Sequence, residues 1–293
     1  MNPSVTEEKF KRVYVEIGNI CNLQCSFCPE VEKRDFQIEL EPFRKVLLQV
    51  REHTERVCFH LMGEPTFHPL FPQLVDIAHE LSVKAEITTN GTRLAPEIEA
   101  ALLKPAVVQV NFSLQSFFDN FPKADPQTYL QKIFSFTRQA MSVRPDLYIN
   151  YRLWNLVSGE TSINELVFCA IEREFGVSLN RRVDPGHRKS KRIVQRLYLH
   201  FDSRFEWPHL QKGVAKTSGS CYGTRTHVGI HADGSVVPCC LDKEAVISLG
   251  NVHEQDLSQI LQGEKFLKIK KGFEQGVLVE ELCQRCDYAR RFN

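Results

Sequence analysis

The feature that most constrains the fold is a repeated alternation of short apolar or β-branched runs with longer amphipathic segments between residues 13 and about 183. The short runs are VYVEI (13–17), RVCFHLM (56–62), KAEITTN (84–90), VVQVNFSL (107–114), LYINYRLW (147–154) and, more weakly, VSLNRRV (177–183). The segments between them carry apolar residues at helical spacing. Strands that alternate with helices predict a parallel sheet with right-handed crossovers. Six such units favour an open or partial α/β barrel over a closed eight-unit barrel, which takes about 250 residues by itself.

Polar turns follow the predicted strands at their carboxyl ends. They are the loop after residue 17, Gly63-Glu64-Pro65, Asn90-Gly91-Thr92, Ser113 to Ser116, and Asn155. In parallel α/β architectures, ligands bind at this edge of the sheet. The sequence therefore predicts a ligand site built from these turns.

Three cysteines with the spacing C-x3-C-x2-C, Cys21, Cys25 and Cys28, lie in the loop after the first predicted strand. Because the sequence has no apolar run suited to a signal peptide or a membrane span, we expect a cytoplasmic protein without a membrane partner. In that reducing compartment, ten cysteines favour metal or redox chemistry over disulfides. Three thiolates could surround one face of an iron-sulfur cluster and leave one iron open. A structural zinc site is the alternative, although such sites usually take four protein ligands.

The C-x3-C-x2-C loop after the first strand resembles that of the radical S-adenosylmethionine (SAM) superfamily, and the resemblance extends along nearly the whole chain. It implies that Cys21, Cys25 and Cys28 hold a 4Fe-4S cluster whose open iron binds SAM. The implied activity is reductive cleavage of SAM to a 5′-deoxyadenosyl radical, which abstracts a hydrogen from a substrate carbon. An electron donor such as flavodoxin or ferredoxin is the implied partner.

The resemblance also assigns residues to SAM binding. Phe27 matches the aromatic residue near the adenine. Met62-Gly63-Glu64-Pro65 resembles the Gly-Gly-Glu-Pro turn that holds the methionine amino group, with Met62 in place of the first glycine. Further candidates, at strand ends where relatives place polar groups against the SAM carboxylate or ribose, are Thr88, Thr89, Asn90, Ser113 and Gln115. Hydrogen-bonded turns are an equally good interpretation of these five. Arg152 and Asn155 could reach SAM or substrate, or could be polar residues of the barrel floor.

A second cysteine group, Cys221-x17-Cys239-x43-Cys283-x2-Cys286, lies near the carboxyl terminus. Asp233-Gly234 predicts a hairpin that would bring distant cysteines together. Four thiolates fully ligate a 4Fe-4S cluster, so this cluster would not bind SAM. A structural zinc ion is again the alternative.

The layout of this group resembles the auxiliary-cluster extension of radical SAM enzymes, called SPASM, or Twitch when it is shortened to one cluster. No cysteine follows Cys286, so the shortened version is the better match. Cys240 is an alternative ligand to Cys239, which the G-x4-C register favours. Cys58 and Cys169 are predicted to be small buried hydrophobic residues.

Around residue 184 the composition changes. We expect a partial (β/α)6 radical SAM barrel over residues 1–184, a basic linker over 185–215 and a small auxiliary 4Fe-4S cluster module over 216–293. The basic run from Arg181 to Arg196 is usually a solvated face, but it could bind the phosphates of RNA or an acidic leader peptide. The formal net charge of +1 predicts no overall attraction to nucleic acid.

The leading hypothesis is a radical SAM enzyme that carries out a net oxidation, by dehydrogenation or new bond formation, assisted by one auxiliary 4Fe-4S cluster. The second keeps this chemistry and changes the substrate from a small molecule to a ribosomal peptide or RNA. The third is a zinc-stabilised binding protein without catalysis. Candidates for a base in a dehydrogenation are Glu16, Arg152 and Asp233. The histidines, which lack metal-binding spacing and are predicted to be structural or surface residues, are His60, His68, His227, His231 and His253.

Overall fold

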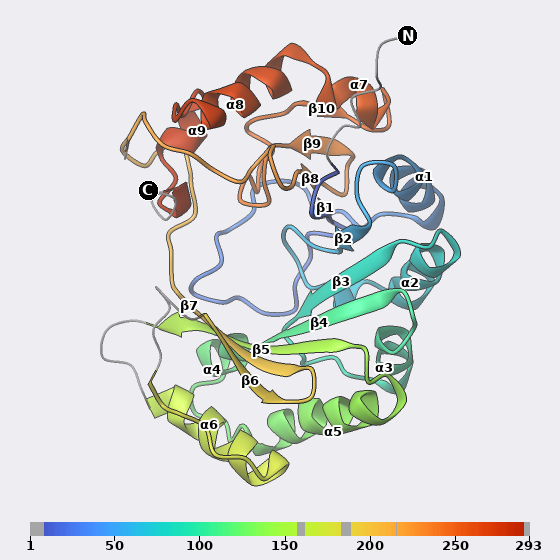
Figure 1. Cartoon of the computed structure of the whole chain (residues 1–293), viewed down its shortest axis with the longest axis vertical. Coiled ribbons are helices and arrows are strands. Elements are labelled where there is room, and N and C mark those ends of the chain that lie inside the picture. The colour runs from blue at the N-terminus through green and yellow to red at the C-terminus, as the bar shows by residue number, and fades with distance from the viewer. Residues whose placement is uncertain (1–8, 157–161, 183–188, 215, 290–293) are drawn as a thin grey trace.

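The computed structural model describes residues 9–156, 162–182, 189–214 and 216–289. Within these residues the strands form one ten-stranded sheet. Its six central strands are parallel and lie in the order β1 (Val13–Val15), β2 (Arg56–Cys58), β3 (Lys84–Thr89), β4 (Val107–Ser113), β5 (Tyr148–Leu156) and β7 (Leu197–Ser203). The sheet is curved but not closed (Figure 1). The predicted α/β class and partial barrel are confirmed.

Helices cover the outer face of this sheet (Figure 1). They are α1 (Leu40–Val50), α2 (Phe71–Glu80), α3 (Pro96–Leu102), α4 (Leu114–Asn120), α5 (Gln127–Val143) and α6 (Ser162–Phe175). Side chains alternate between the two faces of each strand. In β5, Ile149, Tyr151 and Leu153 are buried in the core. The residues between them, including Arg152 and Trp154, therefore face the inside of the barrel.

The prediction of a strand over residues 177–183 is wrong. Residues 177–182 form neither helix nor strand, and residue 183 lies outside the described part. The sixth parallel strand is β7, which pairs with β5, and β6 (Ser190–Val194) pairs with β7 in antiparallel orientation. Part of the segment predicted to be a linker therefore extends the sheet. Leu197, Leu199 and Phe201 are fully buried at alternate positions, a strand signal that the adjacent charges obscured.

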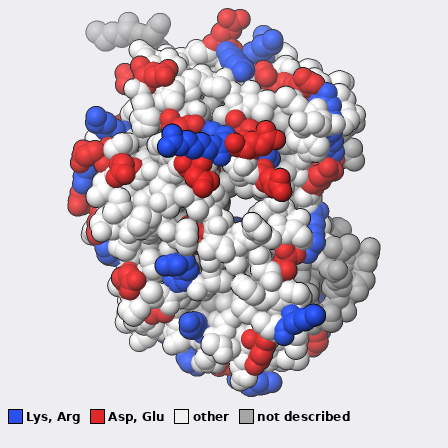
Figure 2. Space-filling model, turned by 180° about the vertical axis from the view of Figure 1, so that it is seen from behind, with Lys and Arg blue, Asp and Glu red and all other residues white. Residues whose placement is uncertain are grey.

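Two cations of the basic run pair with neighbouring acids, whereas Lys191, Arg192 and Arg196 donate to backbone carbonyls. Arg181 forms ion pairs with Glu165 and Glu172 of α6, and Lys189 pairs with Asp202 of β7 at 3.1 Å. Figure 2 shows one face of the molecule, on which acidic and basic side chains are interspersed and no large area carries a single sign. This pairing favours the interpretation of the run as a folded surface.

The carboxyl-terminal part continues the same sheet. β8 (Gly229–Ile230) pairs in parallel with β1, and β9 (Ser235–Val237) and β10 (Gly250–Asn251) follow it in antiparallel orientation. The hairpin predicted at Asp233-Gly234 joins β8 to β9, and Gly234 has a φ of +87°. Three helices, α7 (Leu257–Leu261), α8 (Glu264–Glu274) and α9 (Glu281–Gln284), pack over this part (Figure 1). None of the helices described is long and apolar enough for a membrane crossing.

Candidate cofactor and substrate site

The first cysteine group lies in the loop between β1 and α1. Cys21, Cys25 and Cys28 are free thiols that are at least partly exposed. A hydrogen bond with the Cys28 thiol lowers the pKa of Cys25 to about 7 and raises that of Cys28. Side chains that reach each other in this way can ligate a common group.

Two residues at the end of α4 tie this loop in place. The Asp119 carboxylate accepts hydrogen bonds from the backbone N–H and the hydroxyl of Ser26, both at 2.6 Å. The Asn120 side-chain oxygen accepts a bond from the Gln24 N–H at 2.9 Å, and its Nδ2 lies 3.1 Å from Cys25 Sγ as a donor. These contacts pre-form the loop around the thiols.

The predicted Gly63-Glu64-Pro65 turn lies against the cysteine loop. Gly63 has a φ of +73°, and a Cβ built on it would lie 2.3 Å from the Gly18 carbonyl oxygen, so only glycine fits. The Glu64 N–H donates to the Ile20 carbonyl at 3.0 Å. Burial raises the pKa of Glu64, although four hydrogen bonds from neighbouring groups oppose the shift. Pro65 begins a short 3-10 helix, Pro65–Phe67.

The Glu64 side chain holds this turn, and the Thr89 and Asn90 side chains hold the neighbouring turn at the end of β3. The Glu64 carboxylate accepts from the Thr66 backbone N–H at 3.0 Å and from the Asn90 N–H at 2.6 Å. The Thr89 hydroxyl accepts from Gly91 N–H at 3.0 Å, and the Asn90 Nδ2 donates to the Asn22 side chain at 3.0 Å. These side chains therefore make the contacts expected of residues that hold hydrogen-bonded turns.

A cavity of about 230 Å³ opens inside the barrel, bounded by the first cysteine group at Cys28 and by Cys240 of the second. Of the predicted site residues it is lined by Phe27, Thr88, Ser113, Gln115 and Arg152. Asn155 is not among its lining residues; it lies inside β5 rather than after it, and its side-chain oxygen is buried without a partner in the described structure.

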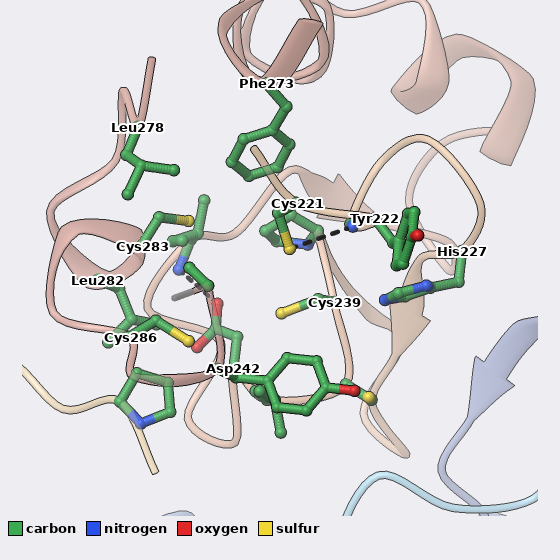
Figure 3. A pocket seen from close by; sticks show the side chains of 18 of the residues that line it. Cys221, Tyr222, His227, Cys239, Asp242, Phe273, Leu278, Leu282, Cys283 and Cys286 are labelled. Atoms are coloured by element: carbon green, nitrogen blue, oxygen red, sulfur yellow. Dashed lines mark hydrogen bonds between the residues drawn. The ribbon is translucent and has the colours of Figure 1, made fainter. Parts of the chain in front are cut away.

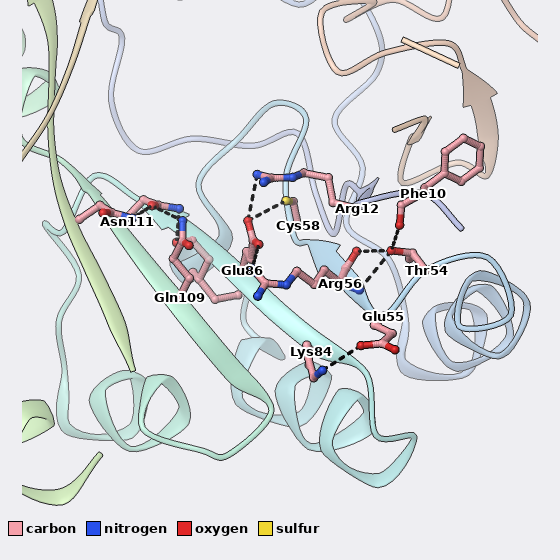
Figure 4. Close-up of polar contacts among 12 residues, drawn as sticks. Phe10, Arg12, Thr54, Glu55, Arg56, Cys58, Lys84, Glu86, Gln109 and Asn111 are labelled. Carbon is pink, nitrogen blue, oxygen red and sulfur yellow. Dashed lines mark hydrogen bonds and ion pairs between the residues drawn. The ribbon is translucent and has the colours of Figure 1, made fainter. Parts of the chain in front are cut away.

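Other residues on the cavity wall were missed by sequence reasoning. They are Arg12, Tyr14, Cys58, His60, Glu86, Asn111 and Trp154. Figure 4 shows the floor of the barrel, where the Glu86 carboxylate lies between Arg12 and Arg56 and accepts from them at 3.1 and 3.0 Å. The Cys58 thiol donates to the same carboxylate at 3.6 Å. For the residues that lie within strands, alternating inward-facing positions were the signal that could have found them.

The second cysteine group surrounds another cavity, of about 180 Å³. Figure 3 shows the sulfur atoms of Cys221, Cys239, Cys283 and Cys286 turned toward a shared space. Cys240 lines both this cavity and the barrel cavity. Burial raises the pKa of Cys240 to about 11, and a hydrogen bond with Tyr14 opposes this shift.

The arrangement of these thiols fits a cluster better than a single ion. A zinc ion holds its thiolates about 2.3 Å from one point. In the part of the chain that the structure describes, no three Cys, His, Asp or Glu side chains converge in that way. Four thiols around a cavity suit an iron-sulfur cluster, because the inorganic core keeps its ligands apart.

The sequence matches the radical SAM superfamily over residues 15–151 and an iron-sulfur cluster-binding domain, SPASM, over residues 221–287. This chain is a radical SAM protein with a SPASM domain. Its cofactors are accordingly SAM, the 4Fe-4S cluster that binds SAM, and auxiliary iron-sulfur clusters. The two cysteine-lined sites provide donors of the type that such clusters require.

Relatives of this radical SAM protein include a cofactor-modifying protein and a maturase. It is 25% identical to the tungsten-containing aldehyde ferredoxin oxidoreductase cofactor-modifying protein of Pyrococcus furiosus, over 87% of this chain and 82% of that protein. It is 33% identical to the mycofactocin maturase MftC of Mycobacterium ulcerans over 103 residues, which are 34% of this chain and 27% of that protein.

Two solved structures share the fold of this radical SAM protein. SuiB of Streptococcus suis bound to precursor peptide SuiA has a TM-score of 0.63 at 18% identity, covering 96% of this chain and 71% of SuiB. BtrN in complex with AdoMet and 2-DOIA has a TM-score of 0.57 at 15% identity, covering 95% of this chain and 93% of BtrN.

The remaining predictions concern two further cysteines and two candidate bases. Cys169 lies on α6 as predicted but is exposed, so its burial was predicted wrongly, whereas Cys58 is buried in β2. The Glu16 carboxylate accepts from the backbone N–H groups of Met62 and Ala232. Asp233 pairs with Lys33 at 2.6 Å. Neither Glu16 nor Asp233 is among the lining residues of the barrel cavity, which leaves them without the contact that a substrate base needs.

Proposed function

We propose that this protein oxidises its substrate at a carbon atom by radical chemistry, with one auxiliary 4Fe-4S cluster assisting. The observation that carries this proposal is the barrel cavity, whose lining includes both Cys28 and Cys240. A substrate in this cavity would lie between the two cysteine groups. When bound and reduced, SAM and its cluster supply a 5′-deoxyadenosyl radical that removes a hydrogen atom.

The chain's own residues would position the two ligands. Cys21, Cys25 and Cys28 would hold the SAM-binding cluster, and Cys221, Cys239, Cys283 and Cys286 the auxiliary cluster. The Gly63-Glu64-Pro65 turn would present its backbone to the methionine amino group, while Phe27 would lie against the adenine. Thr89, through its hydroxyl, and Asn90, through its backbone N–H, would hold this turn. Ser113 and Gln115 reach the cavity from the end of β4 and start of α4, where they could contact the SAM carboxylate or ribose.

A ribosomal peptide is the second candidate substrate. It is favoured by the similarity in fold to SuiB, which was solved with precursor peptide SuiA. RNA bound through Arg181 to Arg196 has less support, because Arg181 and Lys189 are already paired with acidic side chains. A small electron-transfer protein such as flavodoxin or ferredoxin would deliver the electron, and we expect the protein to work in the cytoplasm.

The proposal is tested by anaerobic reconstitution with iron and sulfide analysis and electron paramagnetic resonance. The wild type should bind about eight irons per chain, and a variant with Cys21, Cys25 and Cys28 all changed to alanine about four. SAM should perturb the spectrum of the wild type alone, and reductant should release 5′-deoxyadenosine only there. Failure of the wild type to cleave SAM would overturn the enzymatic function. Four irons in the wild type and none in the variant would eliminate the auxiliary cluster.

A further inference from the structure

Arg152 lies in the middle of the barrel without a charged partner. It projects from β5 and lines the barrel cavity, and its guanidinium carbon lies 4.6 Å from the centre of the Trp154 ring. The Trp154 Nε1 donates to His200 Nδ1 at 2.9 Å, which fixes the ring on which Arg152 stacks. Among the described residues, Arg152 has no hydrogen bond or ion pair. Burial lowers the pKa of Arg152, as expected of a cation whose water has been removed without a full replacement.

The cavity wall does not supply the missing negative charge. Glu86 is the one carboxylate among the lining residues in the described part of the chain, and it already accepts hydrogen bonds from Arg12 and Arg56 (Figure 4). Arg204, a further cation on the wall, has Asp119 at 3.5 Å as its own partner. The inner surface therefore carries an excess positive charge centred on Arg152. A half-buried cation that lines a cavity without a counter-ion is a natural partner for an anionic ligand.

Two further polar atoms on the same wall lack partners within the described structure. They are His60 Nδ1 and Gln115 Oε1, and both are buried. Burial, together with the charges of Arg152 and Arg12, lowers the pKa of His60 to about 3, so its ring is neutral at physiological pH. Buried polar atoms in folded proteins are almost always hydrogen-bonded. A cavity wall with an unpaired guanidinium, an imidazole nitrogen and an amide oxygen suits a polar, anionic ligand.

We propose that the barrel cavity binds a substrate with an anionic oxygen group, a carboxylate or a phosphate, which pairs with the guanidinium of Arg152. This inference rests on the proposed function, because it assigns the substrate to the same cavity. The planar guanidinium can donate two parallel hydrogen bonds to either group, and stacking on Trp154 holds its plane. Arg152 therefore serves as a positioning contact that sets which end of the substrate faces the first cysteine group.

The SAM carboxylate is the competing anion, since Arg152 lies beside Ser113 in the register of β4 and β5. Besides the larger effect of burial, the charge of Arg152 acts to lower the pKa values of Tyr14, Cys58 and His60, so Arg152 lies near these three residues. They line the barrel cavity together with Cys240 of the second cysteine group. This placement favours the substrate as the partner of Arg152.

The test uses reconstituted protein saturated with SAM and titrates it with inorganic pyrophosphate or with succinate under anaerobic calorimetry. The wild type should bind at least one of these probes, and Arg152→Met should weaken that binding at least about tenfold, the loss expected for a charge-assisted hydrogen bond. Arg152→Lys, which keeps the charge but not the fork, should retain part of the affinity. Preference for pyrophosphate or for succinate identifies the group as phosphate or carboxylate.

Arg44→Met is the control. Arg44 lies on α1, pairs with Glu80 at 2.6 Å and is outside the cavity lining, so its loss should leave probe binding unchanged. Absence of probe binding in the wild type, or equal binding in wild type and Arg152→Met, would overturn the proposal. A tenfold loss of SAM affinity in Arg152→Met without probe would also overturn it, since Arg152 would then hold SAM. Iron content checks that each variant is folded, and SAM cleavage by the wild type tests the radical function separately.

Discussion

The Glu64 carboxylate accepts a hydrogen bond from the backbone N–H of Asn90 at 2.6 Å, which joins the turn after β2 to the end of β3. The other carboxylate oxygen accepts from the backbone and the hydroxyl of Thr66. One buried side chain therefore holds two of the turns that surround the predicted SAM site.

Glu64→Ala should lower the free energy of unfolding by about 3 kcal/mol, because it leaves two buried N–H groups without acceptors. Urea unfolding of the metal-free protein measures this change. Glu97→Ala, at an exposed position in the first turn of α3, is the control and should change the free energy by less than about 0.5 kcal/mol. Equal losses in the two variants would show that the Glu64 contacts are not stabilising.

Gly63→Ala should destabilise the protein by about 3 to 5 kcal/mol, since its Cβ would collide with the Gly18 carbonyl in a left-handed conformation. Gly176 provides a matched control, because it has a φ of +63° but no atom within 4 Å of an added Cβ. Gly176→Ala should therefore cost only about 1 kcal/mol. Thermal and urea unfolding compare the two. A Gly63→Ala variant as stable as Gly176→Ala would rule out the close approach of the turn to Gly18.

Asn120→Leu should lower the reduction potential of the first cluster. The Asn120 Nδ2 donates to Cys25 Sγ at 3.1 Å, and hydrogen bonds to ligating sulfur stabilise the reduced, more negative cluster. Loss of a bond of about 1 kcal/mol corresponds to about 40 mV for one electron. Potentiometric titration followed by electron paramagnetic resonance measures the shift. An unchanged or higher potential would mean that the Asn120 contact is not retained around the cluster.

Cys239→Ala should lower the iron content by about four atoms per chain, while Cys240→Ala should retain all of the iron. The reason is position: Cys239 faces the shared space with Cys221, Cys283 and Cys286, whereas Cys240 also borders the barrel cavity (Figure 3). Iron and acid-labile sulfide analysis after anaerobic reconstitution distinguishes the two variants. The opposite pattern, with iron lost from Cys240→Ala alone, would exchange the two assignments.

His60 should make stability fall at mildly acidic pH. Its pKa is about 3 in the folded protein and about 6.5 in the unfolded chain, so between these values only the unfolded chain binds the proton. This removes about 1.4 kcal/mol of stability between pH 7.5 and 5.5. His60→Asn should show a loss smaller by that amount when urea unfolding is repeated at both pH values. Identical pH dependence in the two proteins would mean that His60 protonates in the folded state.

The spacing of the cysteines indicates two groups of thiols, and the family resemblance assigns these groups to iron-sulfur clusters. Cys21, Cys25 and Cys28 share one short loop, so their proximity is a local property of the chain. The period-2 and helical patterns likewise predicted the first five strands and the helices α1, α2, α3 and α5 between them, because backbone geometry relates these periods directly to secondary structure. The helix α4 was missed, since a polar turn was expected at Ser113 to Ser116. The Asp233-Gly234 hairpin follows from local turn chemistry in the same way.

The cavity, in contrast, is a product of tertiary structure. Cys58, Glu86 and Arg152 come from three different strands, and Arg12 directly precedes a fourth, β1. They meet only because the curved sheet turns one face of each strand inward. The sixth strand, Leu197–Ser203, could not be located from its own charged surroundings, since its pairing with β5 depends on burial rather than on local sequence. Sequence therefore determined which cofactors the chain is equipped to bind, and long-range strand pairing decided which charges face the substrate.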